Sequence, residues 1–154
     1  MNAKENIKKI IIKKPLKLDC GKTINDYPLA YETYGSLNEK KDNAILAFHA
    51  LTGDQFVTDI NPITKKPGWW SYLVGPSKAI DTNKFFVICA NVIGGCMGSL
   101  WPSTIDPQTN KTYGTNFPVI TINDMVNAQY NILEFFKIDQ LYSVLGGSMG
   151  GMQV

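Results

Sequence analysis

Three runs of consecutive apolar residues predict strands that are covered on both faces. They span 43–50, 84–90 and 141–145, and such unbroken runs are typical of buried parallel strands. Segments 7–19 and 27–34 alternate polar and apolar positions instead, which predicts two earlier strands joined by a turn at 19–22. The pattern therefore predicts two antiparallel strands followed by parallel ones.

One helix is predicted between the last two apolar runs. Thr121 can cap it, with Asp124 three residues later completing a variant of the capping box. The apolar residues that follow recur at helical spacing and form a face for the sheet: Met125, Ala128, Ile132, Phe135 and Phe136. A weaker helical segment spans 70–80 and is interrupted by Gly75-Pro76. Buried strands alternating with helices predict a mostly parallel sheet with helices on both faces.

Composition and charge bear on which classes of partner the protein can be expected to bind. The chain has 154 residues, 44% of them hydrophobic, with a formal charge of +2. Such a small charge does not indicate a nucleic-acid or anionic-membrane partner, and no stretch approaches the roughly 20 apolar residues of a membrane span. Lysines 8, 9, 13, 14 and 17 interleave with isoleucines, which favours an edge strand with solvated lysines over a phosphate-binding patch. We expect no nucleic-acid or membrane partner.

The cysteines and the single histidine do not predict a metal site. Cys20, Cys89 and Cys96 lack zinc-ligand spacing, and His49 is the only histidine. Cys89 lies in an apolar run and is expected in the core. Cys96 lies in a glycine-rich loop, where it could approach a pocket, although packing is its expected role. Free thiols without a secretory signal indicate the cytoplasm.

The segment after the last apolar run carries the Gly-x-Ser-x-Gly pattern of a nucleophile elbow. Ser148 stands between glycines, with Gly146 and Gly147 before it and Gly150 after it. The turn holds the serine in a strained backbone conformation, and side chains at the neighbouring positions would collide with the adjacent strand and helix. The alternative is a dinucleotide-binding loop, but that fingerprint requires a glycine at its third position, where this chain has Ser148. Ser148 is therefore the predicted nucleophile.

Acyl chemistry at a serine needs a base, an orienting acid and backbone donors for the oxyanion. In an elbow of this kind one donor is the N–H of Met149, and the second comes from the loop after the third strand, here 49–54, where we assign it to Leu51. His49 precedes Ser148, whereas the base of this fold follows the serine. We therefore expect His49 and Gly53 to shape the oxyanion loop, and the base and acid to lie beyond residue 154.

Residues 91–121 form a long segment with little periodicity, which we interpret as a functional loop. Gly94-Gly95-Cys96-Met97-Gly98 lacks the ending of a phosphate-binding loop.

Four motifs together resemble homoserine O-acetyltransferases. They are Phe48-His49-Ala50-Leu51-Thr52-Gly53-Asp54, Asn91-Val92-Ile93-Gly94-Gly95-Cys96-Met97-Gly98-Ser99, Tyr113-Gly114-Thr115-Asn116-Phe117-Pro118 and Gly146-Gly147-Ser148-Met149-Gly150-Gly151. The resemblance implies an α/β-hydrolase-fold acyltransferase of methionine biosynthesis, cytoplasmic and a homodimer when full length. It implies that an acyl-serine carries the acyl group from acetyl-CoA, a co-substrate rather than a bound cofactor, to L-homoserine. Leu100-Trp101 departs from the family pattern, and it either packs on the domain or reshapes the pocket.

Several alternatives stay open at this point. A serine hydrolase or esterase of the same fold forms the same intermediate, and relatives of the family use succinyl-CoA or serine. A non-catalytic module is the alternative outside the enzymes. We expect residues 1–154 to be the amino-terminal part of a single α/β-hydrolase domain, truncated after the elbow, and to be inactive and insoluble in isolation.

Overall fold

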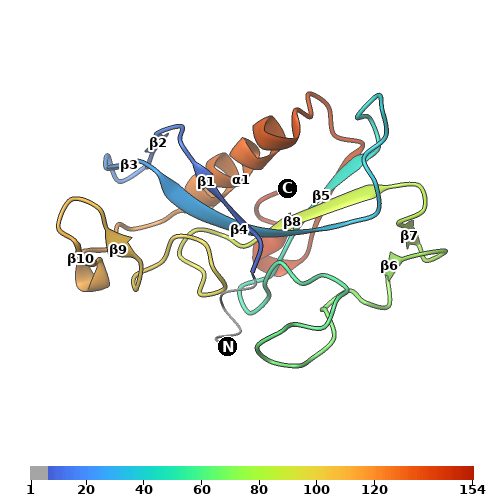
Figure 1. Ribbon diagram of the computed structural model, residues 1–154, viewed down its shortest axis with the longest axis horizontal. Helices are drawn as coiled ribbons and strands as arrows, with labels where there is room; N and C mark the ends of the chain where they lie inside the picture. Colours follow the sequence, from blue (N-terminus) through green and yellow to red (C-terminus); the bar gives the residue numbers. More distant parts are fainter. Residues whose placement is uncertain (1–6) are drawn as a thin grey trace.

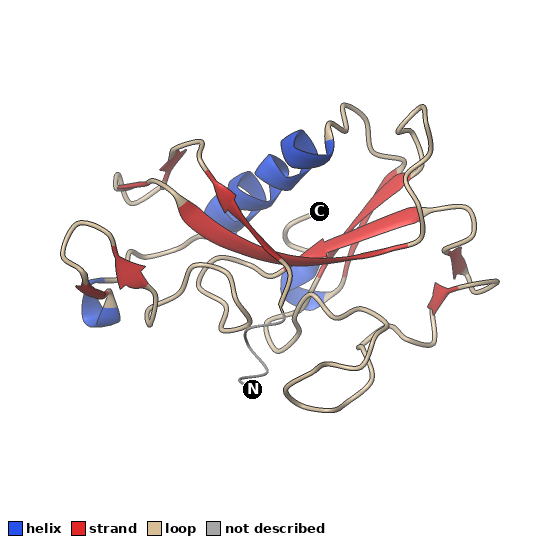
Figure 2. Ribbon diagram, in the orientation of Figure 1, coloured by secondary structure: helices blue, strands red, loops and turns tan. Residues whose placement is uncertain are grey.

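The computed structural model describes residues 7–154, in which one α-helix lies against a mixed five-stranded sheet (Figures 1 and 2). The elements, in chain order, are β1 (Lys9–Ile12), β2 (Leu16–Lys17), β3 (Thr23–Ile24), β4 (Tyr27–Tyr34), β5 (Ala44–Phe48), β6 (Val74–Gly75), β7 (Ile80–Asp81), β8 (Phe86–Ala90), β9 (Ile105–Asp106), β10 (Lys111–Thr112), the 3-10 helix η2 (Gly114–Asn116), α1 (Ile122–Phe136), β11 (Ser143–Gly146) and the 3-10 helix η3 (Ser148–Gly150). The large sheet has the order β1-β4-β8-β5-β11.

The sheet opens with antiparallel strands and continues with parallel ones, as predicted. β1 pairs with β4 and β4 with β8 in antiparallel fashion, whereas β8, β5 and β11 run parallel to one another. These three parallel strands are the three apolar runs, and β5 and β8 are buried at every position. The predicted strand 7–19 divides into β1 and β2. The turn at 19–22 joins β2 to β3 rather than to β4, because Gly21 N–H donates to Leu18 O at 2.9 Å and closes a small hairpin.

Helix α1 begins where the capping signal predicted. Thr121 Oγ1 accepts a hydrogen bond from Asp124 N–H at 3.2 Å, and Asp124 Oδ2 accepts one from Thr121 N–H at 2.9 Å, so the capping box is complete. Ala128 and Ile132 are fully buried against the sheet. Phe135 was expected on this face but is 53% exposed, because it lies at the edge of the face, where its ring meets Tyr31.

The two faces of the sheet are covered differently. On β5, Leu46 and Phe48 belong to the core beneath α1, whereas Ile45 and Ala47 pack with Val57 on the other face. Figure 1 shows loops rather than a helix on that second face. A second helical layer was expected, but within residues 7–154 the second face is packed by loop residues that also include Trp69 and Trp70, together with Val74 of β6.

The helix expected at 70–80 is not formed. Gly75 has a φ of +150°, outside the helical range, and β6 pairs with β7 there instead. The Gly75-Pro76 interruption, rather than the weak helical pattern around it, decides the local structure.

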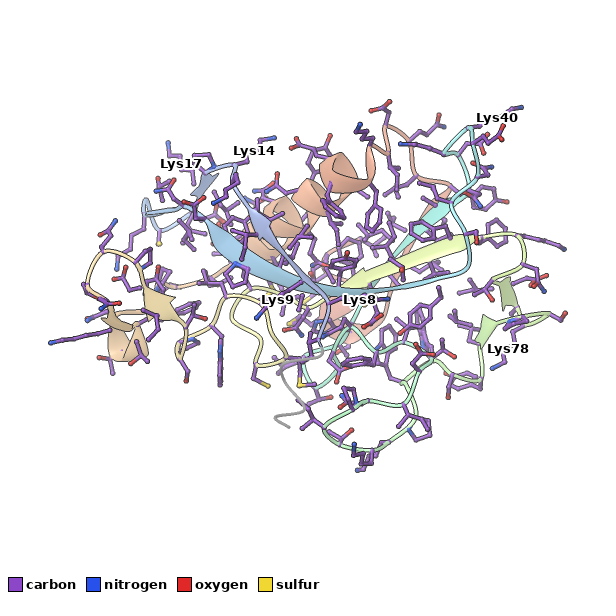
Figure 3. All side chains as sticks on the ribbon, viewed as in Figure 1. Lys8, Lys9, Lys14, Lys17, Lys40 and Lys78 are labelled. Carbon is purple, nitrogen blue, oxygen red and sulfur yellow. The ribbon has the colours of Figure 1, made fainter. Side chains whose placement is uncertain are left out.

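The amino-terminal lysines lie along an edge strand, as predicted. β1 is the outer strand of the sheet, and Lys8 and Lys14 form ion pairs with Glu32 at 2.9 Å and Glu134 at 2.5 Å. Figure 3 places Lys8 and Lys9 at one end of β1, away from Lys14 and Lys17. The lysines are therefore spread along the edge and partly neutralised.

Candidate active site

The carboxyl ends of the three parallel strands bring the predicted site segments to one edge of the sheet. His49 follows β5 directly, Asn91 follows β8, and Gly147-Ser148 follows β11. The register pairs Ala47 with Cys89 and Gly146 with Phe48, so these segments leave the sheet at the same level. The carboxyl edge of parallel strands is where open α/β sheets bind their ligands.

Ser148 occupies the strained conformation that an elbow requires. Its φ is +56°, and the preceding Gly147 is extended, with φ −128° and ψ 147°. A non-glycine residue at positive φ is uncommon and marks a turn or a functional constraint. Ser148 is exposed and begins η3. The strand, the sharp turn and the helical turn thus follow in the order that the motif predicts.

Two of the elbow glycines are required by close packing, and the third is not. A Cβ on Gly150 would lie 2.2 Å from Phe48 O, and a Cβ on Gly146 would lie 2.3 Å from Gly150 O. Both contacts are with backbone atoms, which cannot move aside. A Cβ on Gly147 meets nothing within 4 Å in residues 7–154, so the expected collision is wrong for Gly147.

The two predicted oxyanion donors are both available. Within residues 7–154, the N–H groups of Leu51 and Met149 donate none of the backbone hydrogen bonds. Leu51 is 76% exposed, whereas the Met149 side chain is buried. Both residues line the same pocket, so the structure brings the predicted donors together, and their role in catalysis stays a prediction.

His49 is buried, and both of its ring nitrogens are engaged. Nδ1 lies 2.8 Å from Ala50 O, and Nε2 accepts from Val92 N–H at 3.2 Å. The ring is therefore assigned as the tautomer that carries its proton on Nδ1. Burial lowers the pKa of His49, against smaller opposing effects of its bond to Ala50 and of the Asp54 charge. A neutral histidine without a free nitrogen is not placed to accept a proton from Ser148.

Gly53 closes the turn after His49. Its N–H donates to Ala50 O at 2.8 Å, and a Cβ on Gly53 would lie 3.1 Å from His49 Cβ. Little space is thus left for a side chain at Gly53 beside His49, and both residues lie within hydrogen-bond distance of the carbonyl of Ala50.

A buried polar network beside His49 was not found by the sequence reasoning. Asn91 is 1% exposed, Gln55 is fully buried, and Ser99 is 1% exposed. Gln55 Nε2 donates to Met97 O at 2.9 Å, and Ser99 Oγ donates to Asn91 O at 2.5 Å. The available signal was position: Asn91 is the first residue after a buried parallel strand, where ligand-facing residues are expected.

A pocket of about 390 Å³ lies at this edge. Its walls come from the loop after β5, the segment 91–120, the start of α1 and the elbow. The lining residues in the described chain include no aspartate, glutamate, lysine or arginine: His49, Leu51, Gly53, Asn91, Val92, Ile93, Gly94, Gly95, Cys96, Met97, Pro102, Phe117, Pro118, Ile120, Met125 and Met149. The long segment after β8 thus supplies most of the pocket wall. Ser148 itself does not line the pocket but precedes Met149, which does.

The departure at Leu100-Trp101 lies outside the pocket lining. Leu100 is 3% exposed and belongs to the core beneath α1. Neither Leu100 nor Trp101 is among the residues that line the pocket. For Leu100 the packing interpretation is therefore the one that the structure supports.

The cysteines differ in environment. Cys89 is fully buried, as expected, and burial raises the pKa of its thiol, which keeps it protonated and unreactive. Cys96 was expected to pack but is exposed and lines the pocket, because the loop that carries it turns outward at Gly94 and Gly98, both at positive φ. In the described residues, no group of three His, Cys, Asp or Glu side chains could hold a metal ion.

Among residues 7–154, no helix combines the length and apolar character needed to cross a membrane.

Comparison with known proteins gives one family and several close relatives. A family model for the alpha/beta hydrolase fold matches residues 43–154. A homoserine O-acetyltransferase of Pelagibacter ubique is 78% identical over 99% of this chain, and the chain spans 41% of the length of that relative. A crystal structure of homoserine O-acetyltransferase from Bacillus anthracis has a TM-score of 0.87 at 34% identity, covering 95% of this chain and 40% of that one. The crystal structure of esterase E22 has a TM-score of 0.83 at 36% identity, covering 96% and 42%.

Proposed function

This chain belongs to the α/β hydrolase fold family, and from that premise we propose that the full-length protein is an acyltransferase with Ser148 as its nucleophile. The observation that carries the proposal is the conformation of Ser148, held at a φ of +56° where β11 ends and next to the pocket wall. Strain of this kind persists only where the surrounding structure imposes it. Here the close approach of Gly146 and Gly150 to neighbouring backbone imposes it.

The proposed reaction has two acyl transfers. Ser148 Oγ attacks the thioester carbonyl of acyl-CoA, and its proton passes to a base. The C–S bond then breaks, and the CoA sulfur leaves with the bonding electrons and takes that proton from the base. The N–H groups of Leu51 and Met149 stabilise the tetrahedral oxyanion, each contributing on the order of 3 kcal/mol. The side-chain hydroxyl of homoserine, deprotonated by the same base, then attacks the acyl-serine, and the base returns the proton to Ser148 Oγ as the ester bond to Ser148 breaks.

We assign the base and its orienting acid to the full-length protein outside residues 1–154. His49, the only histidine of the chain, has both ring nitrogens engaged and a pKa lowered chiefly by burial. The relative in Pelagibacter ubique is much longer than the segment it shares with this chain, which leaves room for both groups.

Acetyl from acetyl-CoA is the donor group that we propose, with L-homoserine as the acceptor. The name of the relative that is 78% identical supports both. The absence of lysine and arginine among the pocket-lining residues of the described chain also favours an uncharged acetyl group over succinyl, whose carboxylate needs a cationic partner. A place in methionine biosynthesis, a homodimer and the cytoplasm complete the proposal and follow from the family resemblance alone.

Product analysis tests this function. The full-length protein is incubated with acetyl-CoA and homoserine, and the products are separated and quantified. We expect O-acetylhomoserine as the main product, with serine and succinyl-CoA as poorer alternatives. If O-succinylhomoserine forms at a higher rate, the proposed donor is wrong. If O-acetylserine forms at a higher rate, the proposed acceptor is wrong.

Ester hydrolysis is the second candidate function. Esterase E22 shares this fold at 36% identity, and an elbow serine with an oxyanion hole serves water as well as an alcohol. Free acetate in place of O-acetylhomoserine, with homoserine present, would favour the hydrolase.

A further inference from the structure

In the oxyanion loop, the peptide unit between Ala50 and Leu51 is held in place by contacts to its carbonyl oxygen. The carbonyl of Ala50 accepts from Gly53 N–H at 2.8 Å and lies 2.8 Å from His49 Nδ1. Ala50 C=O and Leu51 N–H belong to the same planar peptide, so fixing the direction of one fixes the direction of the other. The His49 ring therefore aims the Leu51 N–H, although it does not contact it.

The orientation of the His49 ring depends in turn on Asn91. Asn91 Nδ2 lies 3.3 Å from His49 Nε2, and Val92 N–H donates to the same nitrogen. Two donors at Nε2 require that atom to be an acceptor, which leaves the proton on Nδ1, facing Ala50 O.

Asn91 is itself held at every polar atom. Its N–H donates to Ala30 O at 2.8 Å, its carbonyl accepts from Ser99 Oγ, and Oδ1 accepts from Met97 N–H at 3.2 Å. A Cβ on Gly95 would lie only 2.8 Å from Oδ1, so the surrounding loop is closely fitted to this side chain. Asn91 thus joins the oxyanion loop to the loop that forms the pocket wall.

We propose that Asn91 is a positioning residue for acyl transfer, which aims the Leu51 N–H at the oxyanion through His49 and the Ala50 carbonyl. This rests on the proposed function, because it assumes that an acyl-serine forms at Ser148. The contribution is to the transition state: a donor turned away from the oxyanion slows acylation while leaving the pocket walls that bind the ester largely in place.

The test measures acylation of the full-length protein by p-nitrophenyl acetate, which reports the acyl-serine step whichever acceptor is natural. Asn91→Ala is compared with Asn131→Ala, a matched control. Asn131 lies in α1 and is also buried, at 6% exposure. Its Nδ2 donates to Tyr27 OH at 2.8 Å, and neither residue is among those that line the pocket. We expect Asn91→Ala to lower the acylation rate constant by roughly ten- to a hundredfold with a nearly unchanged KM, and Asn131→Ala to stay within about twofold of the wild type.

A double variant separates positioning from general stability. If Asn91 acts through His49, the Asn91→Ala/His49→Ala protein should be acylated about as slowly as His49→Ala alone, so the two losses do not multiply. Acylation of Asn91→Ala at the wild-type rate, an equal loss in Asn131→Ala, or losses that multiply in the double variant would each overturn the positioning role. A wild-type protein that is not acylated at Ser148 would instead overturn the proposed function, and the positioning role with it.

Discussion

The elbow and the oxyanion loop lie next to each other at the same sheet edge, but they are held in place by different means. The elbow is held by backbone contact: Gly146 and Gly150 leave no space for a methyl group. The oxyanion loop is held by buried polar side chains, with His49 and Asn91 at 1% exposure linking it to the next loop. The elbow has no space for a methyl group at Gly146 or Gly150, whereas the oxyanion loop depends on its buried hydrogen bonds.

This difference determines how each region fails. An added methyl group at the elbow must displace backbone, which moves the nucleophile itself. A lost side chain in the loop leaves buried partners without hydrogen bonds, which costs about 1–3 kcal/mol per group and reorients a donor. We therefore expect a methyl group added at a close-packed elbow glycine to abolish acylation outright. Substitutions in the oxyanion loop should instead reduce acylation in steps.

The largest effect is expected for Gly150→Ala. The new methyl would lie 2.2 Å from Phe48 O, so we expect the full-length protein to lose about 3 kcal/mol or more of unfolding free energy, together with acylation at Ser148. Urea unfolding and p-nitrophenyl acetate acylation measure the two losses. Gly147→Ala is the matched control, since that methyl meets nothing in residues 7–154 and the φ of −128° suits alanine. Equal losses in both variants would show that the elbow is not held by close packing.

A smaller, pH-dependent effect is expected from His49. Because burial lowers its pKa in the folded state below the ordinary 6.5, the unfolded chain binds the extra proton first as the pH falls. His49 should therefore contribute a loss of stability below about pH 6.5, with a slope of at most about 1.4 kcal/mol per pH unit. The free energy of unfolding can be measured with urea between about pH 7.5 and 5, which brackets that ordinary pKa. It should change less steeply with pH in His49→Gln than in the wild type. Identical slopes would mean that His49 titrates normally.

The smallest effect is expected at a polar contact between α1 and the elbow. Gln129 Nε2 donates to Gln153 Oε1 at 2.6 Å, and Gln153 Nε2 donates to Met149 O at 3.3 Å, while Gln129 Oε1 has no hydrogen-bond partner among residues 7–154. Gln129→Met removes one hydrogen bond but also relieves that unpaired oxygen, so we expect a loss of only about 1 kcal/mol. A thermal unfolding scan measures it, and a loss as large as that of Gly150→Ala would show that the elbow depends on this side chain.

The sequence predicts the parts of this molecule that depend on local pattern. The three apolar runs become the parallel strands β5, β8 and β11, and the capping signal at Thr121 marks the start of α1. The weak helical pattern at 70–80 fails because the Gly75-Pro76 interruption outweighs it, and β6 pairs with β7 in place of the expected helix.

The same division holds at the site. The elbow could be predicted because its residues form one contiguous pattern, although the contact that requires Gly150 is with Phe48 on a strand distant in the sequence and Gly147 meets no such contact in residues 7–154. The partners of His49 Nε2, Asn91 and Val92, lie far from it along the chain, and only the sheet register brings Asn91 and His49 side by side. No spacing rule within the sequence encodes such a contact.

The central claim, that Ser148 accepts the acyl group, is tested most directly by mass spectrometry of the full-length protein. After a brief incubation with acetyl-CoA and no acceptor, the intact protein should gain the mass of one acetyl group, and peptide mapping should locate it on Ser148. The Ser148→Ala protein should gain none. An acetyl group on another residue such as the pocket-lining Cys96, or an adduct that persists in Ser148→Ala, would contradict the account.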